Sequence, residues 1–130
     1  MAIRKFSSIS VETTLASGIN SSTTSVAVSS GTGSALLGGV TLDPAVGGVY
    51  PDQFTVAIDP DTTNEEIVFV EYRSSDTLTV VRGRAGTSPI AHSAGATVKH
   101  VLTSDDLNAF EAGLQSGTGG TVSSLLLMGG

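Results

Sequence analysis

Residues 65–101 of this chain read EEIVFVEYRSSDTLTVVRGRAGTSPIAHSAGATVKHV, and this stretch decides the fold. From Glu66 to Arg73, one face is apolar with a charged end and the other is wholly apolar, which is typical of a strand covered on both sides. The polar turn Ser74-Ser75-Asp76 leads into a second run, Thr77 to Arg82, in which apolar and polar residues alternate. The stretch therefore predicts a β-hairpin, then a long loop, then a third strand.

Strand patterns continue on the N-terminal side of this hairpin. Residues 11–15 and 25–29 can form short strands, and residues 53–59 show a clear apolar alternation. We therefore predict an all-β fold, mainly an antiparallel small barrel or sandwich, over residues 11–102. The side chains expected in its core are Val26, Val28, Phe54, Val56, Ile58, Ile67, Phe69, Val80 and Val98.

Further segments are predicted on both sides of the β domain. Residues 1–10 have the pattern of an extended N-terminal arm. A short helix is expected over residues 103–116, because Ser104 can cap it and the two aspartates that follow suit the positive end of the helix dipole. Residues 117–130 read as a Gly/Ser-rich flexible tail with an apolar tip.

Composition limits the classes of function. The 130 residues include no cysteine and no tryptophan, and the formal net charge is −6. Without cysteine there is no disulfide and no thiolate metal site, and an acidic balance argues against nucleic-acid binding. No stretch has the length of a membrane span. We therefore expect neither nucleic acid nor membrane as a partner, and the small core with many glycines indicates reliance on neighbouring subunits.

Three features invite a chemical interpretation, and a structural role is favoured for each. The acidic turn 59–66 offers oxygens for calcium but lacks the spacing and central glycine of a calcium loop. His92 and His100 have no histidine at metal-ligand spacing, and no serine lies in a nucleophile elbow. The ring of His92 is instead expected to close the loop 82–96 by hydrogen bonding. The glycines of residues 83–95 are expected in turns, so the sequence predicts no enzyme, no metal and no cofactor.

The order and spacing of several motifs resemble a small β-module of tailed-bacteriophage virion proteins. The likeness runs from Ser10 to Leu107 and is carried by VETTLASGINSSTTSVAVSSGTG, the EEIV strand, TLTVVRGRAGTS and AHSAGATVKHVLTSDDL. This module occurs in head-decoration, head-fibre and minor tail proteins. The resemblance implies a structural part of the virion more than it implies which part. The expected location is the capsid surface, after assembly in the host cytoplasm.

The preferred role is a head-decoration or minor capsid protein that binds and stabilises the capsid shell. The expected partners are the major capsid protein or other virion subunits, and the resemblance to decoration proteins implies a homo-oligomer, a trimer. A tail, neck or baseplate component is the alternative within the same class. A carbohydrate-binding β-module is a further alternative, disfavoured because exposed aromatic side chains are scarce.

Two groups of residues are the predicted contacts at the ends of the chain. The arm is expected to bind a neighbouring subunit by adding a strand to an exposed edge, through Ile3, Arg4, Lys5 and Phe6. Contacts within the oligomer are expected on the helix and the apolar tip of the tail, at Leu107, Phe110, Leu114, Leu125, Leu126, Leu127 and Met128.

A third group lies in the irregular stretch 31–52 and the hairpin, at Leu36, Leu37, Val40, Arg82 and Arg84. Apolar residues in so long a loop need a cover, which is either the domain itself or a partner. The two arginines suit an acidic partner surface, and the alternative for both is an ion pair with Glu71 or Asp76 across the hairpin.

Overall fold

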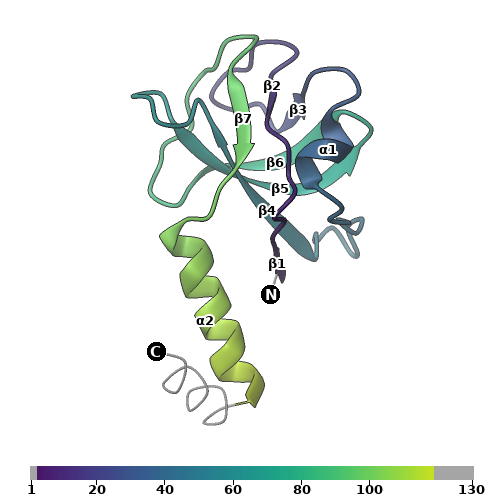
Figure 1. The fold of residues 1–130 in the computed structure, drawn as a ribbon, viewed down its shortest axis with the longest axis vertical. Helices are drawn as coiled ribbons and strands as arrows, with labels where there is room; N and C mark the ends of the chain where they lie inside the picture. The colour runs from purple at the N-terminus through teal and green to yellow at the C-terminus, as the bar shows by residue number, and fades with distance from the viewer. Residues whose placement is uncertain (1–2, 119–130) are drawn as a thin grey trace.

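The computed structural model describes the backbone of residues 3–118 and the side chains of residues 3–111. Within these residues the chain is mainly antiparallel β-sheet with two helices, which confirms the predicted all-β class (Figure 1). In chain order the elements are β1 (Ile3–Lys5), β2 (Thr13–Thr14), β3 (Ser25–Ala27), α1 (Gly33–Leu37), β4 (Asp52–Ile58), β5 (Glu66–Ser74), β6 (Thr77–Arg84), β7 (Thr97–His100) and α2 (Ser104–Thr118).

The predicted hairpin is the centre of the sheet. β5 and β6 pair antiparallel through the turn at Ser75, a residue with a positive φ of 58°, and β4 pairs with the other edge of β5. The β5–β6 ladder shifts register in two places, between Ile67 and Phe69 and between Val70 and Tyr72. Such bulges increase the local twist, so they help the long hairpin to curl.

The curled sheet forms a half-barrel whose end strands meet. The strand order is β2-β7-β4-β5-β6-β3, and the two outer strands approach each other at the bridge between Leu15 and Val28. The backbone N–H of Ala16 donates to the carbonyl oxygen of Ala27 at 3.0 Å beside this bridge. The side chains facing inward form one core, and all of the predicted core residues are buried.

The stretch 31–52 contains a helix that the sequence did not predict. α1 has only five residues, so it is too short to show helical periodicity. The carboxylate of Asp76, in the hairpin turn, accepts the backbone N–H groups of Gly31 and Gly33 at 2.9 and 3.0 Å. These hydrogen bonds hold the pKa of Asp76 below its usual value and fasten the start of α1 to the hairpin.

Leu36 and Leu37, on α1, are core residues of the domain. Both side chains are buried, and Val40 is half-buried and packs against the same core. The prediction that these leucines contact a partner was wrong, because the domain itself provides their cover. Because α1 is short and packs on the barrel, it buries apolar residues that the sequence pattern assigns to a loop.

The N-terminal arm joins the sheet of its own chain. β1 pairs in parallel with β4, with Ile3 opposite Asp52 and Lys5 opposite Phe54. After β1 the chain runs along α1, where Ser7 Oγ donates to the carbonyl oxygen of Gly38 at 2.8 Å. The expectation that the arm adds its strand to a neighbouring subunit is therefore corrected, since its backbone partner is β4.

The residue that caps the start of α2 is Thr103, directly before the first helical residue, whereas the sequence predicted Ser104. Thr103 Oγ1 accepts the backbone N–H of Asp106 at 3.1 Å, and Asp106 Oδ2 accepts the backbone N–H of Thr103 at 2.9 Å. This reciprocal pair is a capping box, so Thr103 and not Ser104 caps the helix. From this cap α2 extends away from the barrel (Figure 1). Neither helix in the described part of the chain has the length and apolar character needed to cross a membrane.

Candidate functional site

Glu66, at the start of β5, is the centre of a buried polar network. Its side chain is 0 % exposed, and its carboxylate accepts hydrogen bonds from Arg82 Nε at 2.7 Å and Nη2 at 2.8 Å. The backbone N–H groups of Gly83 and Ile90 donate to the same carboxylate at 2.9 and 3.1 Å. Gly83 adopts a φ of +60° to do so, a conformation that glycine reaches readily.

Arg82 is fully engaged inside the chain. Besides Glu66, its guanidinium donates to the carbonyl oxygens of Asn20, Thr23 and Ile90 at 2.6–2.9 Å, so every N–H of the group has an acceptor. The predicted role of Arg82 as a partner contact was wrong, and so was its pairing with Glu71 or Asp76. The residue fastens the loops around residues 20–23 and 90 to the hairpin.

His92 completes this network and closes the long loop, as predicted. Its Nδ1 lies 2.8 Å from Asp59 Oδ2, and its Nε2 lies 2.9 Å from Glu66 Oε1. Its backbone exchanges hydrogen bonds with Ile19 at 3.0 and 2.9 Å. One histidine therefore joins the turn after β4, the start of β5 and the segment after β2.

The network holds charge in a place that solvent does not reach. Burial by itself raises the pKa of Glu66, but the hydrogen bonds from Arg82, from His92 and from the backbone outweigh it and bring that pKa to about 2. The side chains of Glu66 and His92 are both 0 % exposed, so a substrate has no access to them. The network of Glu66, Arg82 and His92 therefore holds the loop 82–96 in place. Among the side chains of residues 3–111, no cluster of histidine and carboxylate groups has the arrangement of a metal site.

A second polar junction joins β1 to α2 and was not predicted. Arg4 Nη1 donates to Asp106 Oδ1 at 2.8 Å and to Asp105 Oδ2 at 3.1 Å, and its guanidinium lies 4.1 Å from the ring centroid of Phe69. Thr55 Oγ1, on β4, donates to Asp106 Oδ1 at 2.6 Å. These contacts fix the first turn of α2 on the sheet. The guanidinium of Arg4, which was expected to face a partner, is therefore paired with carboxylates of its own chain.

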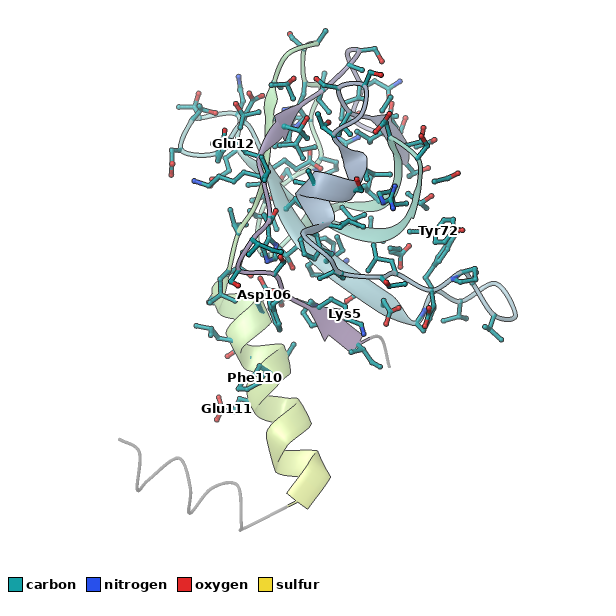
Figure 2. The ribbon with its side chains drawn as sticks, turned by 45° about the vertical axis from the view of Figure 1, so that its right-hand side comes forward. Lys5, Glu12, Tyr72, Asp106, Phe110 and Glu111 are labelled. Carbon is teal, nitrogen blue, oxygen red and sulfur yellow. The ribbon has the colours of Figure 1, made fainter. Side chains whose placement is uncertain are left out.

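Lys5, like Arg4, lies near a carboxylate of its own chain, since its Nζ lies 3.9 Å from Asp52 Oδ1. Asp106 is buried, which raises its pKa, but the hydrogen bonds from Thr55, Arg4 and Thr103 reverse this effect and lower the pKa below its ordinary value. In Figure 2, Asp106 lies at the end of α2 next to the barrel, and Lys5 lies on β1 beside it. Arg4 is therefore structural in the single chain, and Lys5 lies near a carboxylate of the same chain but stays partly exposed.

Large apolar side chains are exposed around this junction. Leu107 and Phe110 on α2 are each 54 % exposed, and Figure 2 shows Phe110 on the part of α2 that extends away from the barrel. We call the following exposed residues the arm–helix surface: Ile3, Phe6, Leu102, Leu107 and Phe110. Of the predicted contact residues, Ile3 and Phe6 lie on or next to β1 and Leu107 and Phe110 lie on α2, and these two elements contact each other.

The other predicted contacts fall in different places. Arg84 is exposed, and its guanidinium lies 5.2 Å from the ring centroid of Phe69. The side chain of Leu114 and residues 125–128 (Leu125, Leu126, Leu127 and Met128) lie outside the described part of the structure, so their predicted contacts stay predictions. Sequence reasoning missed Glu66, whose only signal is a carboxylate at the start of a strand that is otherwise apolar on both faces.

Comparison with known proteins adds no family to this picture. No protein-family model matches the chain, and no curated protein matches it.

Proposed function

We propose that this protein is a non-enzymatic structural subunit of a tailed-bacteriophage virion, a head-decoration or minor capsid protein that attaches to the capsid shell through the arm–helix surface. The observation that carries the proposal is the exposure of Leu107 and Phe110 on a helix whose first turn is rigidly fixed by Asp106. A helix that is held at one end and exposes two large apolar side chains suits a protein–protein contact.

The polar residues support the same class of function. The charged groups that are most buried, Glu66, Arg82 and His92, are enclosed and hold loops together, and they leave no accessible acid–base pair for a reaction. The motifs quoted above for residues 10–107 resemble those of virion proteins and supply the virion context. A tail, neck or baseplate subunit would use the same surface, so the position in the particle separates the two roles.

The partner is proposed to be the major capsid protein, and the protein is proposed to assemble as a homotrimer. The exposed apolar residues of the arm–helix surface lie on or next to two elements, β1 and α2, so one element can contact the shell and the other a second copy. Sedimentation of the purified protein tests the oligomer. A single monomeric species at high concentration, in free solution and after release from particles, would contradict the trimer.

Substitution of Phe110 by serine is expected to weaken rebinding to bare heads at least about tenfold, which corresponds to ~1.4 kcal/mol. The reason is that an exposed aromatic side chain at an interface contributes binding energy that serine does not replace. The measurement is the occupancy of particles as a function of added protein. The matched control is Val11→Ser, which changes a 56 % exposed apolar residue next to Glu12, a residue that lies far from Phe110 in Figure 2, and should leave occupancy unchanged.

If Phe110→Ser and the unmodified protein give equal occupancy and the same thermal unfolding, Phe110 on α2 does not contribute to attachment, which would contradict the proposed surface. Electron microscopy of decorated particles then identifies the position of the bound subunit. Density on the capsid shell supports the decoration role, and density confined to the tail or neck supports the alternative.

A further inference from the structure

An open groove of about 620 Å³ lies where β4 and β5 separate. The antiparallel pairing of these strands runs from Ile58 and Glu66 to Phe54 and Val70, and the groove opens beyond that last pair. One of its walls is the turn 46–49, closed by reciprocal backbone hydrogen bonds of 2.9 and 3.2 Å between Val46 and Val49. The residues that line the groove are Val46, Gly48, Val49, Tyr50, Pro51, Gln53 and Glu71.

Glu71 contributes a carboxylate with no partner in the described part of the chain. Its side chain is half-buried on β5, and no hydrogen bond or ion pair joins it to another described residue. Burial raises the pKa of this carboxyl, and no donor or cation in the described chain offsets that effect. A carboxylate in this position costs stability, which is common where a group serves binding instead of folding.

The basic side chains of the surrounding strands contact groups other than Glu71, although Arg73 Nε is buried without a partner in the described chain and Arg4 Nε donates to Gln53 Oε1 of the groove at 3.3 Å. On β1, Arg4 pairs with Asp105 and Asp106, and Lys5 lies near Asp52. On the hairpin, Arg73 Nη1 donates to the carbonyl oxygen of Ser75 at 2.8 Å, Arg82 binds Glu66, and Arg84 lies over the ring of Phe69. Glu71 is therefore available to a cation from outside the chain.

The rest of the groove is suited to an aliphatic stem. Val46 and Val49 are exposed on the turn, and Pro51 continues the apolar wall. The ring of Tyr50 is stacked on that of Tyr72, with centroids 6.1 Å apart, so one of its faces contacts a second aromatic ring. A tyrosine ring and a carboxylate that line the same groove favour a cation, through the ring and through the charge.

We propose that this groove binds a primary ammonium or a guanidinium group carried on an aliphatic stem, with the cation at Glu71 and the stem against Val46, Val49 and Tyr50. This chemistry is shared by the side chains of lysine and arginine in a partner protein and by free polyamines. The net charge of −6 raises the local concentration of such cations. The site does not depend on the virion role, because its recognition elements lie outside the arm–helix surface.

The test is a titration of isotopically labelled protein, followed by NMR, with two probes: Nα-acetyl-arginine methylamide and spermidine. Chemical-shift changes are expected at residues 46–53 and at Glu71, and the pKa of the Glu71 carboxyl should fall when the probe is present, because the cation stabilises the ionised form. Binding should weaken as the pH falls and Glu71 becomes protonated. The decisive variant is Glu71→Gln, which keeps the shape of the side chain and removes its charge.

Glu71→Gln is expected to weaken binding of the better probe at least about tenfold and to leave the fold intact. The matched control is Glu12→Gln, which neutralises an exposed carboxylate that lies away from Tyr72 in Figure 2 and should bind like the unmodified protein. Tighter binding of the arginine derivative identifies a protein side chain as the source of the cation, and tighter binding of spermidine identifies a polyamine. Equal affinity for Glu71→Gln and the unmodified protein, or shift changes spread over the whole acidic surface, would overturn the proposal.

Discussion

Replacement of Arg82 by leucine is expected to destabilise the domain by about 3–5 kcal/mol, because it leaves the carboxylate of Glu66 buried without its cation. Arg82 also donates to the backbone of Asn20, Thr23 and Ile90, so the variant loses the ties to two loops at once. The measurement is the free energy of unfolding in urea at neutral pH. The denaturant midpoint should fall, and the slope should stay the same if the transition remains two-state.

Arg73→Leu is the matched control for this experiment. It makes the same chemical change on the same hairpin, where the guanidinium donates one hydrogen bond, to the carbonyl oxygen of Ser75. Its cost should stay within about 1 kcal/mol. A loss for Arg82→Leu no larger than that for Arg73→Leu would mean that the buried network contributes little to stability.

A double variant separates charge compensation from simple packing. If Arg82 acts mainly by compensating Glu66, the double variant Glu66→Gln, Arg82→Leu should lose less stability than the sum of the two single changes. Additive losses would show that the two side chains stabilise the fold independently. The smaller-than-additive loss is the expected result, because Glu66 and Arg82 form a direct hydrogen-bonded ion pair with oxygen–nitrogen distances of 2.7 and 2.8 Å.

The acid sensitivity of the protein should depend on the same carboxylate. The folded-state pKa of Glu66 is about 2, below its ordinary value of 4.5. Its contribution to stability is therefore complete above pH 4.5 and is lost as the pH falls towards 2, where the folded state must also take up the proton. Glu66→Gln should show a flatter decline of stability over this range, measured by thermal unfolding at a series of pH values. An unchanged pH profile would assign the acid sensitivity to other carboxylates.

The parts of the fold that the sequence predicted well are those governed by local pattern. Alternation along residues 53–59 and 77–82 identified β4 and β6, and it placed Phe54, Val56 and Val80 in the core, where they lie. Hairpin chemistry identified the turn at Ser75. These features depend on neighbours within a few residues, so a single sequence contains the necessary information.

The parts that the sequence could not predict depend on pairs that are distant along the chain. Arg4 and Asp106 are 102 residues apart, and Arg82 and Asn20 are 62 residues apart. β1 has three residues and pairs in parallel with β4, which leaves no pattern that could be recognised. The charges of the arm were consequently assigned to a partner, whereas in the fold Arg4 attaches α2 and Lys5 lies near Asp52 on β4.

Phe69→Ala should be the other strongly destabilising single change, with a cost of about 3–5 kcal/mol, because it removes a large buried side chain and leaves a cavity. Phe69 is 2 % exposed on the outer face of β5, where the guanidinium groups of Arg4 and Arg84 cover its ring. Phe69→Leu keeps most of the apolar volume and should cost less than about 1.5 kcal/mol. The measurement is again the free energy of unfolding in urea.

Phe110→Ala provides the contrast that connects stability to the proposed attachment. It deletes the same ring from a position that is 54 % exposed on α2, so the free energy of unfolding should change by no more than about 0.5 kcal/mol. Rebinding to bare heads should nevertheless weaken, because the ring belongs to the arm–helix surface. Phe69→Ala should thus lower stability, and Phe110→Ala should weaken rebinding. Rebinding is measured at a temperature at which both variants are folded. Equal losses of stability for Phe69→Ala and Phe110→Ala would contradict the burial of Phe69, and unimpaired rebinding of Phe110→Ala would place the contact on another part of the molecule.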